Sequence, residues 1–301
     1  MPALIECVPN FSEGREQAKV EAIANAMKRD GVYLLDRHMD PDHNRSVITM
    51  AGEREPLMKA VLRGIGKAAE LIDLTRQTGA HPRIGATDVV PFVPLEGVSL
   101  EECTQMARET GAEVWNRFRI PVYLYESAAT RPDRVNLADI RRGQFERLRE
   151  EIATNSDRVP DFGEPCVHPT AGATVVGARK FLVAYNIVLN TADLAVAKKV
   201  ARAVRFSSGG LPFVKALGLP VGGQAQVSMN LTDIDQTPIG RVFDMVKSEA
   251  ARHGVTLKSS EIVGLIPQKA VDKDAEWFRH LGSSAASLIL EDRLAAAMRQ
   301  T

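Results

Sequence analysis

The order in which strand-like and helix-like segments follow one another most limits the folds open to this chain. Over residues 3–93, short apolar runs and amphipathic stretches alternate in the order β-α-β-β-α-β, and the same order returns over 180–263. That order is typical of the split β-α-β, or ferredoxin-like, arrangement. The sequence therefore predicts an α/β (α+β) fold with two such subdomains, each a mixed sheet with helices on its outer face. A last helix, broken near residue 282, is expected over 268–299.

A long irregular stretch, residues 155–177, separates the two patterns. Apolar periodicity disappears there, and Pro, Gly and other small residues dominate. Connectors without secondary structure that are longer than ~12–15 residues usually either carry a function or act as linkers. Before this stretch, a capping box at Ser99 opens a helix, and one charged, exposed helix is expected over 136–153. We place the boundary between an N-terminal subdomain, 1–178, and a C-terminal subdomain, 179–301.

Charge and cysteine content narrow the classes of function. The 301 residues carry 38 Lys+Arg and 38 Asp+Glu, so the excess positive charge that drives nonspecific nucleic-acid binding is missing. No apolar run reaches the ~18 residues of a membrane span, and the N-terminus has no signal-peptide pattern. Cys7, Cys103 and Cys166 lack the spacing of a disulfide framework or a zinc site. We expect a cytoplasmic protein that binds neither nucleic acid nor membranes.

The loop Thr78–Asp88 is the strongest candidate for chemistry. Signatures of nucleotide hydrolysis, serine hydrolases, zinc proteases and dinucleotide binding are absent, which leaves loops as the place to look. Pro82 favours an extended backbone at His81, and an imidazole is suited to proton transfer at neutral pH. Arg83 adds a guanidinium two residues later. His81 is therefore a candidate acid/base, against the alternative that it only packs the loop.

A cluster of carboxylates and imidazoles follows the strand predicted at 31–36. Its members are Asp36, His38, Asp40, Asp42 and His43. Such a set could bind a metal. The run Asp-Pro-Asp-His-Asn is also strong turn chemistry, because short polar side chains bond their own backbone. We favour the turn and expect no metal.

Two further segments are candidates for ligand binding. The loop Gly163–Gly172 joins the two subdomains, and clefts between domains often bind ligands, although a plain hinge explains its composition equally well. In the second half, Gln and other neutral polar residues recur at every second position of a predicted strand. They are Gln224, Gln226, Ser228 and Asn230. They share one face, which either hydrogen-bonds a polar ligand or is simply solvated.

Motifs spread over most of the chain resemble the formiminotransferase family. The stretches that carry the resemblance are Glu6–Gly14, Gly79–Val89 with Pro91–Phe92, Pro121–Tyr125, Pro160–Gly163, Gly172–Val175 with Gly177–Phe181, and Ala225–Ser228 with Asn230–Leu231. The resemblance implies transfer of a formimino group between N-formimino-L-glutamate and tetrahydrofolate, a reaction of histidine degradation and one-carbon metabolism. It implies tetrahydrofolate as co-substrate, a homodimer, and a monofunctional form without the cyclodeaminase domain.

The resemblance also implies roles for individual residues. The family's catalytic histidine falls on His81, which we expect to act as general acid/base. The folate-contacting loop falls on Gly163, Glu164, Pro165, Cys166, Val167, His168, Pro169, Thr170, Ala171 and Gly172. We expect Arg45 or Arg83 to hold a substrate carboxylate through a bidentate pair. Gln226 and Asn230 are expected to contact the substrates in a cleft.

Two other functions remain compatible with the sequence. A glutamate formyltransferase acting on 5-formyltetrahydrofolate would use the same scaffold. A noncatalytic sensor of folate or an amino acid is the second alternative, because fold does not determine function; such a sensor would bind its ligand equally well without His81. The chain also departs from the animal members at His38, where they carry an acidic residue.

Overall fold

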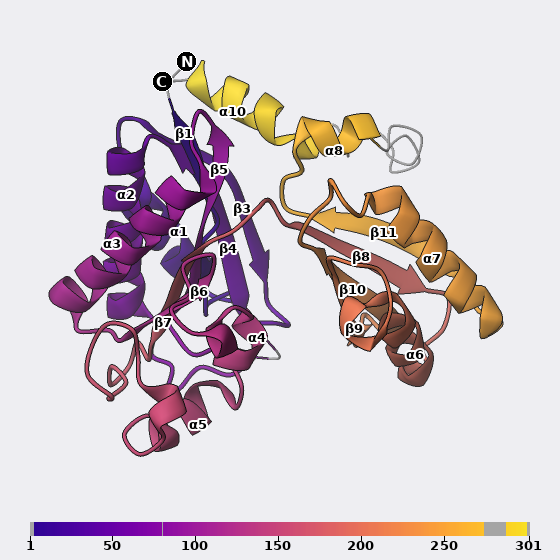
Figure 1. Cartoon of the computed structure of the whole chain (residues 1–301), viewed down its shortest axis with the longest axis horizontal. Helices are drawn as coiled ribbons and strands as arrows, with labels where there is room; N and C mark the ends of the chain where they lie inside the picture. Colours follow the sequence, from indigo (N-terminus) through magenta and orange to yellow (C-terminus); the bar gives the residue numbers. More distant parts are fainter. Residues whose placement is uncertain (1–2, 80, 274–286, 300–301) are drawn as a thin grey trace. The chain divides into compact units, whose positions relative to one another are not determined.

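The computed structural model describes residues 3–79, 81–273 and 287–299. It divides into two compact units, Met1–Arg179 and Lys180–Thr301, called unit 1 and unit 2 below (Figure 1). The division falls one residue after the boundary placed from the sequence.

Unit 1 begins with the predicted succession of strands and helices. The elements are β1 (Leu4–Cys7), α1 (Gln17–Met27), β3 (Val32–Asp40), β4 (Arg45–Gly52), α2 (Arg54–Leu71) and β5 (Thr87–Glu96). The strands lie in the order β3-β4-β1-β5 and are all antiparallel, and the two-residue β2 (Asn10–Phe11) pairs with β4 and β5. The ferredoxin-like arrangement predicted for the first half is confirmed.

Two parallel strands extend this sheet beyond β5. β7 (Thr174–Ala178) pairs in parallel with β5 on one side and with β6 (Val122–Glu126) on the other, so the sheet is mixed, as predicted. α3 (Leu100–Phe118) begins with the expected capping box, in which Ser99 accepts from the backbone N–H of Glu102. All but the last residue of β7 fall in the stretch described from the sequence as irregular. All five of its residues are buried, so the alternation that identifies a half-buried strand is missing.

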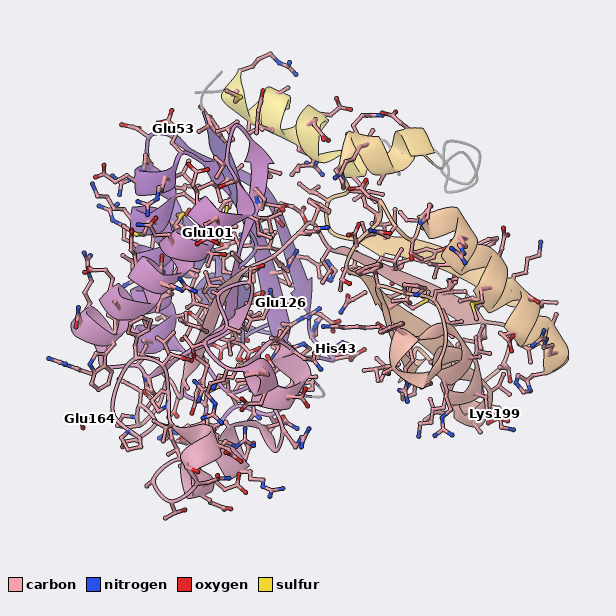
Figure 2. The ribbon with its side chains drawn as sticks, viewed as in Figure 1. His43, Glu53, Glu101, Glu126, Glu164 and Lys199 are labelled. Atoms are coloured by element: carbon pink, nitrogen blue, oxygen red, sulfur yellow. The ribbon has the colours of Figure 1, made fainter. Side chains whose placement is uncertain are left out.

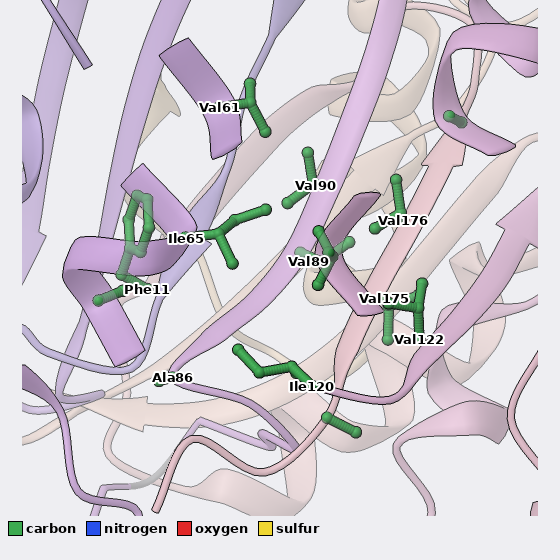
Figure 3. Packing of buried hydrophobic residues seen from close by; sticks show 14 of the residues in the cluster. Phe11, Val61, Ile65, Ala86, Val89, Val90, Ile120, Val122, Val175 and Val176 are labelled. Atoms are coloured by element: carbon green, nitrogen blue, oxygen red, sulfur yellow. The ribbon is translucent and has the colours of Figure 1, made fainter. Parts of the chain in front are cut away.

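The helices α1, α2 and α3 cover one face of the unit 1 sheet (Figure 1). Between them lies a core to which α2 contributes Val61 and Ile65, and β5 contributes Val89 and Val90 (Figure 3). Each such side chain, fully buried, stabilises the fold by about 1.5–3 kcal/mol. Along β4, Ile48 and Met50 lie in this core, whereas Arg45 is only half-buried. Since side chains alternate along a strand, Arg45 lies on the opposite face of the sheet.

The prediction of a single exposed helix over 136–153 is wrong. The structure has two short helices, α4 (Leu137–Ile140) and α5 (Gln144–Glu151). Gly143 separates them with φ +81°, a left-handed conformation that glycine adopts without the steric penalty of a Cβ. The 3-10 turns η1 (Pro132–Arg134) and η2 (Ser156–Arg158) flank this pair. After the break, α5 contacts the His81 loop through Gln144, Phe145 and Glu146.

Unit 2 repeats the fold on a smaller scale. Its elements are β8 (Val183–Leu189), α6 (Leu194–Val204), η3 (Phe206–Ser208), β9 (Val214–Val221), β10 (Gln224–Leu231), α7 (Ile239–Arg252) and β11 (Leu257–Val263). The sheet order is β11-β8-β10-β9, and Val200 of α6 and Val246 of α7 are fully buried in a second core with Tyr185. The second ferredoxin-like unit is confirmed, but its sheet is antiparallel throughout rather than mixed.

Two helices complete the described part of unit 2, α8 (Gln268–Lys273) and α10 (Leu290–Met298). The break predicted near residue 282 lies outside the described residues. Among the helices that the structure describes, none combines the length and the apolar character needed to cross a bilayer.

Candidate active site

The His81 loop, residues 77–86, lies at the amino end of β5 next to the amino end of β7. Its backbone pairs with the 168–173 segment, because the N–H of Ala86 donates to the carbonyl of Ala171 and that of Ala173 to Ile84, both at 2.9 Å. A Cβ on Gly85 would lie 2.0 Å from the carbonyl oxygen of Ala173. Only glycine therefore permits the two segments to approach this closely.

Asn44, in the turn between β3 and β4, joins the segments that surround His81. Its Oδ1 accepts from the N–H of Gly14 at 2.9 Å, and its Nδ2 donates to the carbonyl of Thr78 at 2.8 Å. Gln77 adds bonds to the carbonyls of Asn44 and Ser12, and Ser12 Oγ donates to Gly85 O at 2.7 Å. Asn44 itself has φ +48°, which asparagine tolerates better than most residues. The motif around Ser12 and the His81 loop are thus fixed to one another.

Arg83, predicted to hold a substrate carboxylate, is buried, and all of its donor groups are engaged. Its guanidinium makes five hydrogen bonds, two to Gln77, two to Glu146 and one to Gln144. Its carbonyl accepts from the N–H of Phe145 at 2.8 Å. In this structure Arg83 fastens the start of α5 to the His81 loop, and no N–H of its guanidinium is left for a ligand.

Replacing Arg83 by methionine is expected to lower the free energy of unfolding by about 1–3 kcal/mol, because buried acceptors lose their partners. Chemical denaturation of the variant and the parent protein measures this difference. Glu146→Gln is the matched control, since the Glu146 side chain is 58% exposed and its charge should contribute less than about 1 kcal/mol. Equal stability of Arg83→Met and the parent would contradict the structural role.

His81 is half-buried and hydrogen-bonded to Arg45. Nη1 of Arg45 lies 3.1 Å from Nε2 of His81. A guanidinium can only donate, so Nε2 accepts and the ring proton of a neutral His81 is on Nδ1. Burial, together with the nearby charges of Arg45 and Arg141 and the neighbouring His43, lowers the pKa of His81 from 6.5 to about 2. His81 is therefore uncharged at neutral pH, and its Nε2 lone pair is engaged by Arg45.

Arg141 is a member of this site that the sequence did not indicate. It follows α4, its side chain is 13% exposed, and its Nη2 donates to a carboxylate oxygen of Asp88. The other oxygen of Asp88 accepts from the N–H of Ile84 at 2.7 Å. Arg141 also contributes, after burial, to lowering the pKa of Arg45, since the two positive charges repel. The two guanidiniums therefore belong to one electrostatic cluster around His81.

The end of the polar cluster, from Asp40 to His43, forms the predicted turn. The N–H of His43 donates to Oδ1 of Asp40 at 2.9 Å, and Nδ1 of His43 lies 2.6 Å from Oδ2 of Asp40. The ring of His43 (Figure 2) stands edge-on to that of His81, with centroids 6.4 Å apart. β3 extends to Asp40, so Asp36 and His38 lie within the strand rather than after it. Over the described ranges, no group of three or more His, Cys, Asp or Glu side chains is placed to bind a metal.

The candidate folate loop divides into two parts. Residues 168–172 form a tight turn beside the His81 loop, in which Nδ1 of His168 accepts from the N–H groups of Thr170 and Ala171. Burial also lowers the pKa of His168. The first part is exposed from Glu164 to Cys166, and Figure 2 shows Glu164 on the opposite side of unit 1 from His43. Only the second part is adjacent to His81.

Gln226 and Asn230 lie on β10 in unit 2. Val227 and Met229 lie between these two residues in the sequence and belong to the core. Because side chains alternate along a strand, Gln226 and Asn230 share the opposite face of the sheet. Gln226 is buried, whereas Asn230 is exposed. The predicted alternation along this strand is therefore present.

Comparison with known proteins gives consistent matches over both units. The model of the formiminotransferase domain, N-terminal subdomain, matches residues 4–179, and that of the formiminotransferase domain matches 184–297. A glutamate formimidoyltransferase of Thermoplasma acidophilum is 47% identical over 98% of both chains, and one of Streptococcus pyogenes is 42% identical over 92% of this chain and 94% of the relative. The formimidoyltransferase-cyclodeaminase of Mus musculus is 41% identical, but its match covers 53% of that protein. The chain belongs to the formiminotransferase family.

Proposed function

We propose that this protein is a glutamate formimidoyltransferase, which transfers a formimino group between N-formimino-L-glutamate and tetrahydrofolate. The observation that carries the proposal is an uncharged, half-buried His81 next to two guanidiniums, in a chain whose relatives at 47% and 42% identity bear that name. A formyltransferase or a noncatalytic sensor is less well supported, because those relatives are named for formimidoyl transfer.

His81 accounts for the proton transfers that this reaction needs. A nitrogen of tetrahydrofolate attacks the formimino carbon, forming a new C–N bond and a tetrahedral intermediate. The attacking nitrogen must lose a proton, and the glutamate nitrogen must gain one when its C–N bond breaks. Neutral His81 accepts the first proton at Nε2 and returns it to the departing nitrogen. Binding the two substrates side by side supplies a further part of the acceleration.

The remaining ligand contacts are assigned to residues 163–172 and to two side chains of β10. The backbone and small side chains of residues 163–172 contact tetrahydrofolate, with the 168–172 turn nearest to His81. Gln226 and Asn230 offer neutral hydrogen bonds to the substrates. Tetrahydrofolate acts as a co-substrate without a metal, and the protein works as a cytoplasmic homodimer.

Turnover of the purified protein with defined donors tests the proposal. With N-formimino-L-glutamate and tetrahydrofolate, we expect formation of the 5-formimino product, detected by absorbance after acid converts it to the methenyl form. With 5-formyltetrahydrofolate and L-glutamate we expect at least tenfold slower reaction. Faster formyl transfer would replace the proposed activity by that of a formyltransferase, and folate binding without either turnover would favour a sensor.

A further inference from the structure

Arg45 has a buried guanidinium nitrogen whose hydrogen-bonding capacity is unused. Nη1 donates to His81, but Nε is shielded from solvent and has no hydrogen-bond partner. Over the part of the chain that the structure describes, Arg45 also makes no ion pair. A buried charged donor without an acceptor costs free energy, so its retention points to an acceptor that arrives with a ligand.

Arg141 shows the same feature. Nη2 is bound to Asp88, while Nε is buried and has no partner among the residues described. Its neighbour Arg142 differs, because that side chain is 71% exposed and pairs with Asp139. Two adjacent cations therefore each keep a donor free at the site of His81, which favours an anionic ligand with oxygen acceptors. A carboxylate fits this arrangement, since guanidinium groups bind carboxylates through charge-assisted hydrogen bonds.

We propose that Arg45 and Arg141 together bind a carboxylate of the glutamyl substrate, and that this carboxylate draws Arg45 away from Nε2 of His81. The inference rests on the proposed function for the identity of the substrate. Both arginines thus bind the substrate. In the free protein Arg45 has a second role, because its hydrogen bond to Nε2 prevents His81 from acting as a base.

The block follows from the single lone pair at Nε2. While Nε2 accepts from Arg45, it cannot accept a proton from the attacking nitrogen. A carboxylate carries an opposite charge and can bind a guanidinium through two parallel hydrogen bonds, neither of which a neutral imidazole can offer, so it competes successfully with His81 for Arg45. The bound carboxylate also offsets positive charge beside His81, which makes the imidazolium formed during the reaction less unfavourable.

The other charged groups around His81 are already paired in the free protein. Asp88 is bound by Arg141 and by the N–H of Ile84, and Asp40 is bound by His43. Neither carboxylate lies within ion-pair distance of Arg45 in the described structure. The charge that releases His81 must therefore come from the substrate. Only after the glutamyl substrate is bound does the protein present a base with a free lone pair.

NMR of the His81 ring in the full chain, with L-glutamate as the probe and no folate present, tests this inference. In the free protein we expect His81 to stay neutral over the whole pH range in which the fold persists. Saturating L-glutamate should raise the pKa of His81 by at least one unit, since the added carboxylate stabilises the imidazolium. An unchanged His81 titration with glutamate bound would overturn the inference.

Variants separate binding from folding. Arg141→Gln should weaken L-glutamate binding at least tenfold by calorimetry, whereas Arg142→Gln, the exposed neighbour, should leave it within twofold. Arg141→Lys keeps a charge for Asp88 but lacks Nε, so an intermediate loss is expected even if the glutamine variant is unstable. Equal affinity in Arg141→Lys and the parent would overturn the inference. Tenfold weaker binding in a protein that transfers formyl groups would support the inference and refute the proposed function.

Discussion

Replacing His81 by glutamine is expected to lower kcat by about 10²–10⁴-fold, the range that one general acid/base typically contributes. L-glutamate and tetrahydrofolate should still bind within a fewfold of the parent affinity, because glutamine fills a similar volume and can accept a hydrogen bond from Arg45. Steady-state turnover and calorimetry on the same preparations measure the two effects separately. Retention of turnover within a fewfold would refute the catalytic assignment.

The matched control is His253→Gln, which changes an exposed residue at the end of α7 and should leave activity unchanged.

The pH dependence of stability provides a second check on His81. With a folded pKa of about 2 and an ordinary unfolded value near 6.5, His81 binds fewer protons in the folded state between these limits. Its contribution to stability is therefore complete above pH 6.5 and declines as the pH falls below it, and His81→Gln should remove that decline.

Gly85→Ala is expected to destabilise the protein by about 3 kcal/mol, at the upper end of the cost of overpacking. The new Cβ would meet the carbonyl oxygen of Ala173 at 2.0 Å, and backbone cannot move aside as a flexible side chain can. The segments containing Ala86 and Ala171 would have to separate, so the His81 loop would also shift. Denaturant unfolding measures the loss of stability, and turnover should fall with it.

Gly254→Ala distinguishes this clash from a general effect of replacing glycine. Gly254 has φ +71°, but a Cβ there would meet nothing within 4 Å. The free energy of unfolding should therefore fall by only about 1–2 kcal/mol, which is the cost of placing a residue with a Cβ in the left-handed conformation. Turnover should not change. If Gly85→Ala were no more destabilising than Gly254→Ala, the close approach of the two segments would not hold in solution.

The sequence predicts most of the architecture because most strands have one buried face. β10 is the clearest example, with Val227 and Met229 in the core and polar residues between them. β7 was missed because it is buried on both faces and follows Gly172, so it has no alternation to detect. The α4–α5 break was missed because the run of charged residues continues through Gly143, and a single left-handed residue leaves little trace in a charge pattern.

The site was predictable only in part, for a related reason. His81 was indicated by its loop and by the family resemblance. Arg141 and Arg142 are chemically identical in the sequence, and only the path of the chain after α4 buries one of them against Asp88 while the other stays exposed. The arginine side chain at position 83 suggested a substrate contact, but its guanidinium donors are already hydrogen-bonded to Gln77 and Glu146. Such distinctions depend on tertiary contacts, which local sequence does not specify.

The exposed first part of the candidate folate loop makes this protein suited to site-specific labelling. Cys7 and Cys103 are buried, and burial raises the pKa of both thiols, whereas Cys166 is exposed. A maleimide fluorophore added to the native protein should therefore couple at Cys166, because the reagent can reach that thiol and not the two buried ones. Since Cys166 is two residues before the turn that begins at His168, the attached dye would report on ligand arrival at the loop without any engineered cysteine.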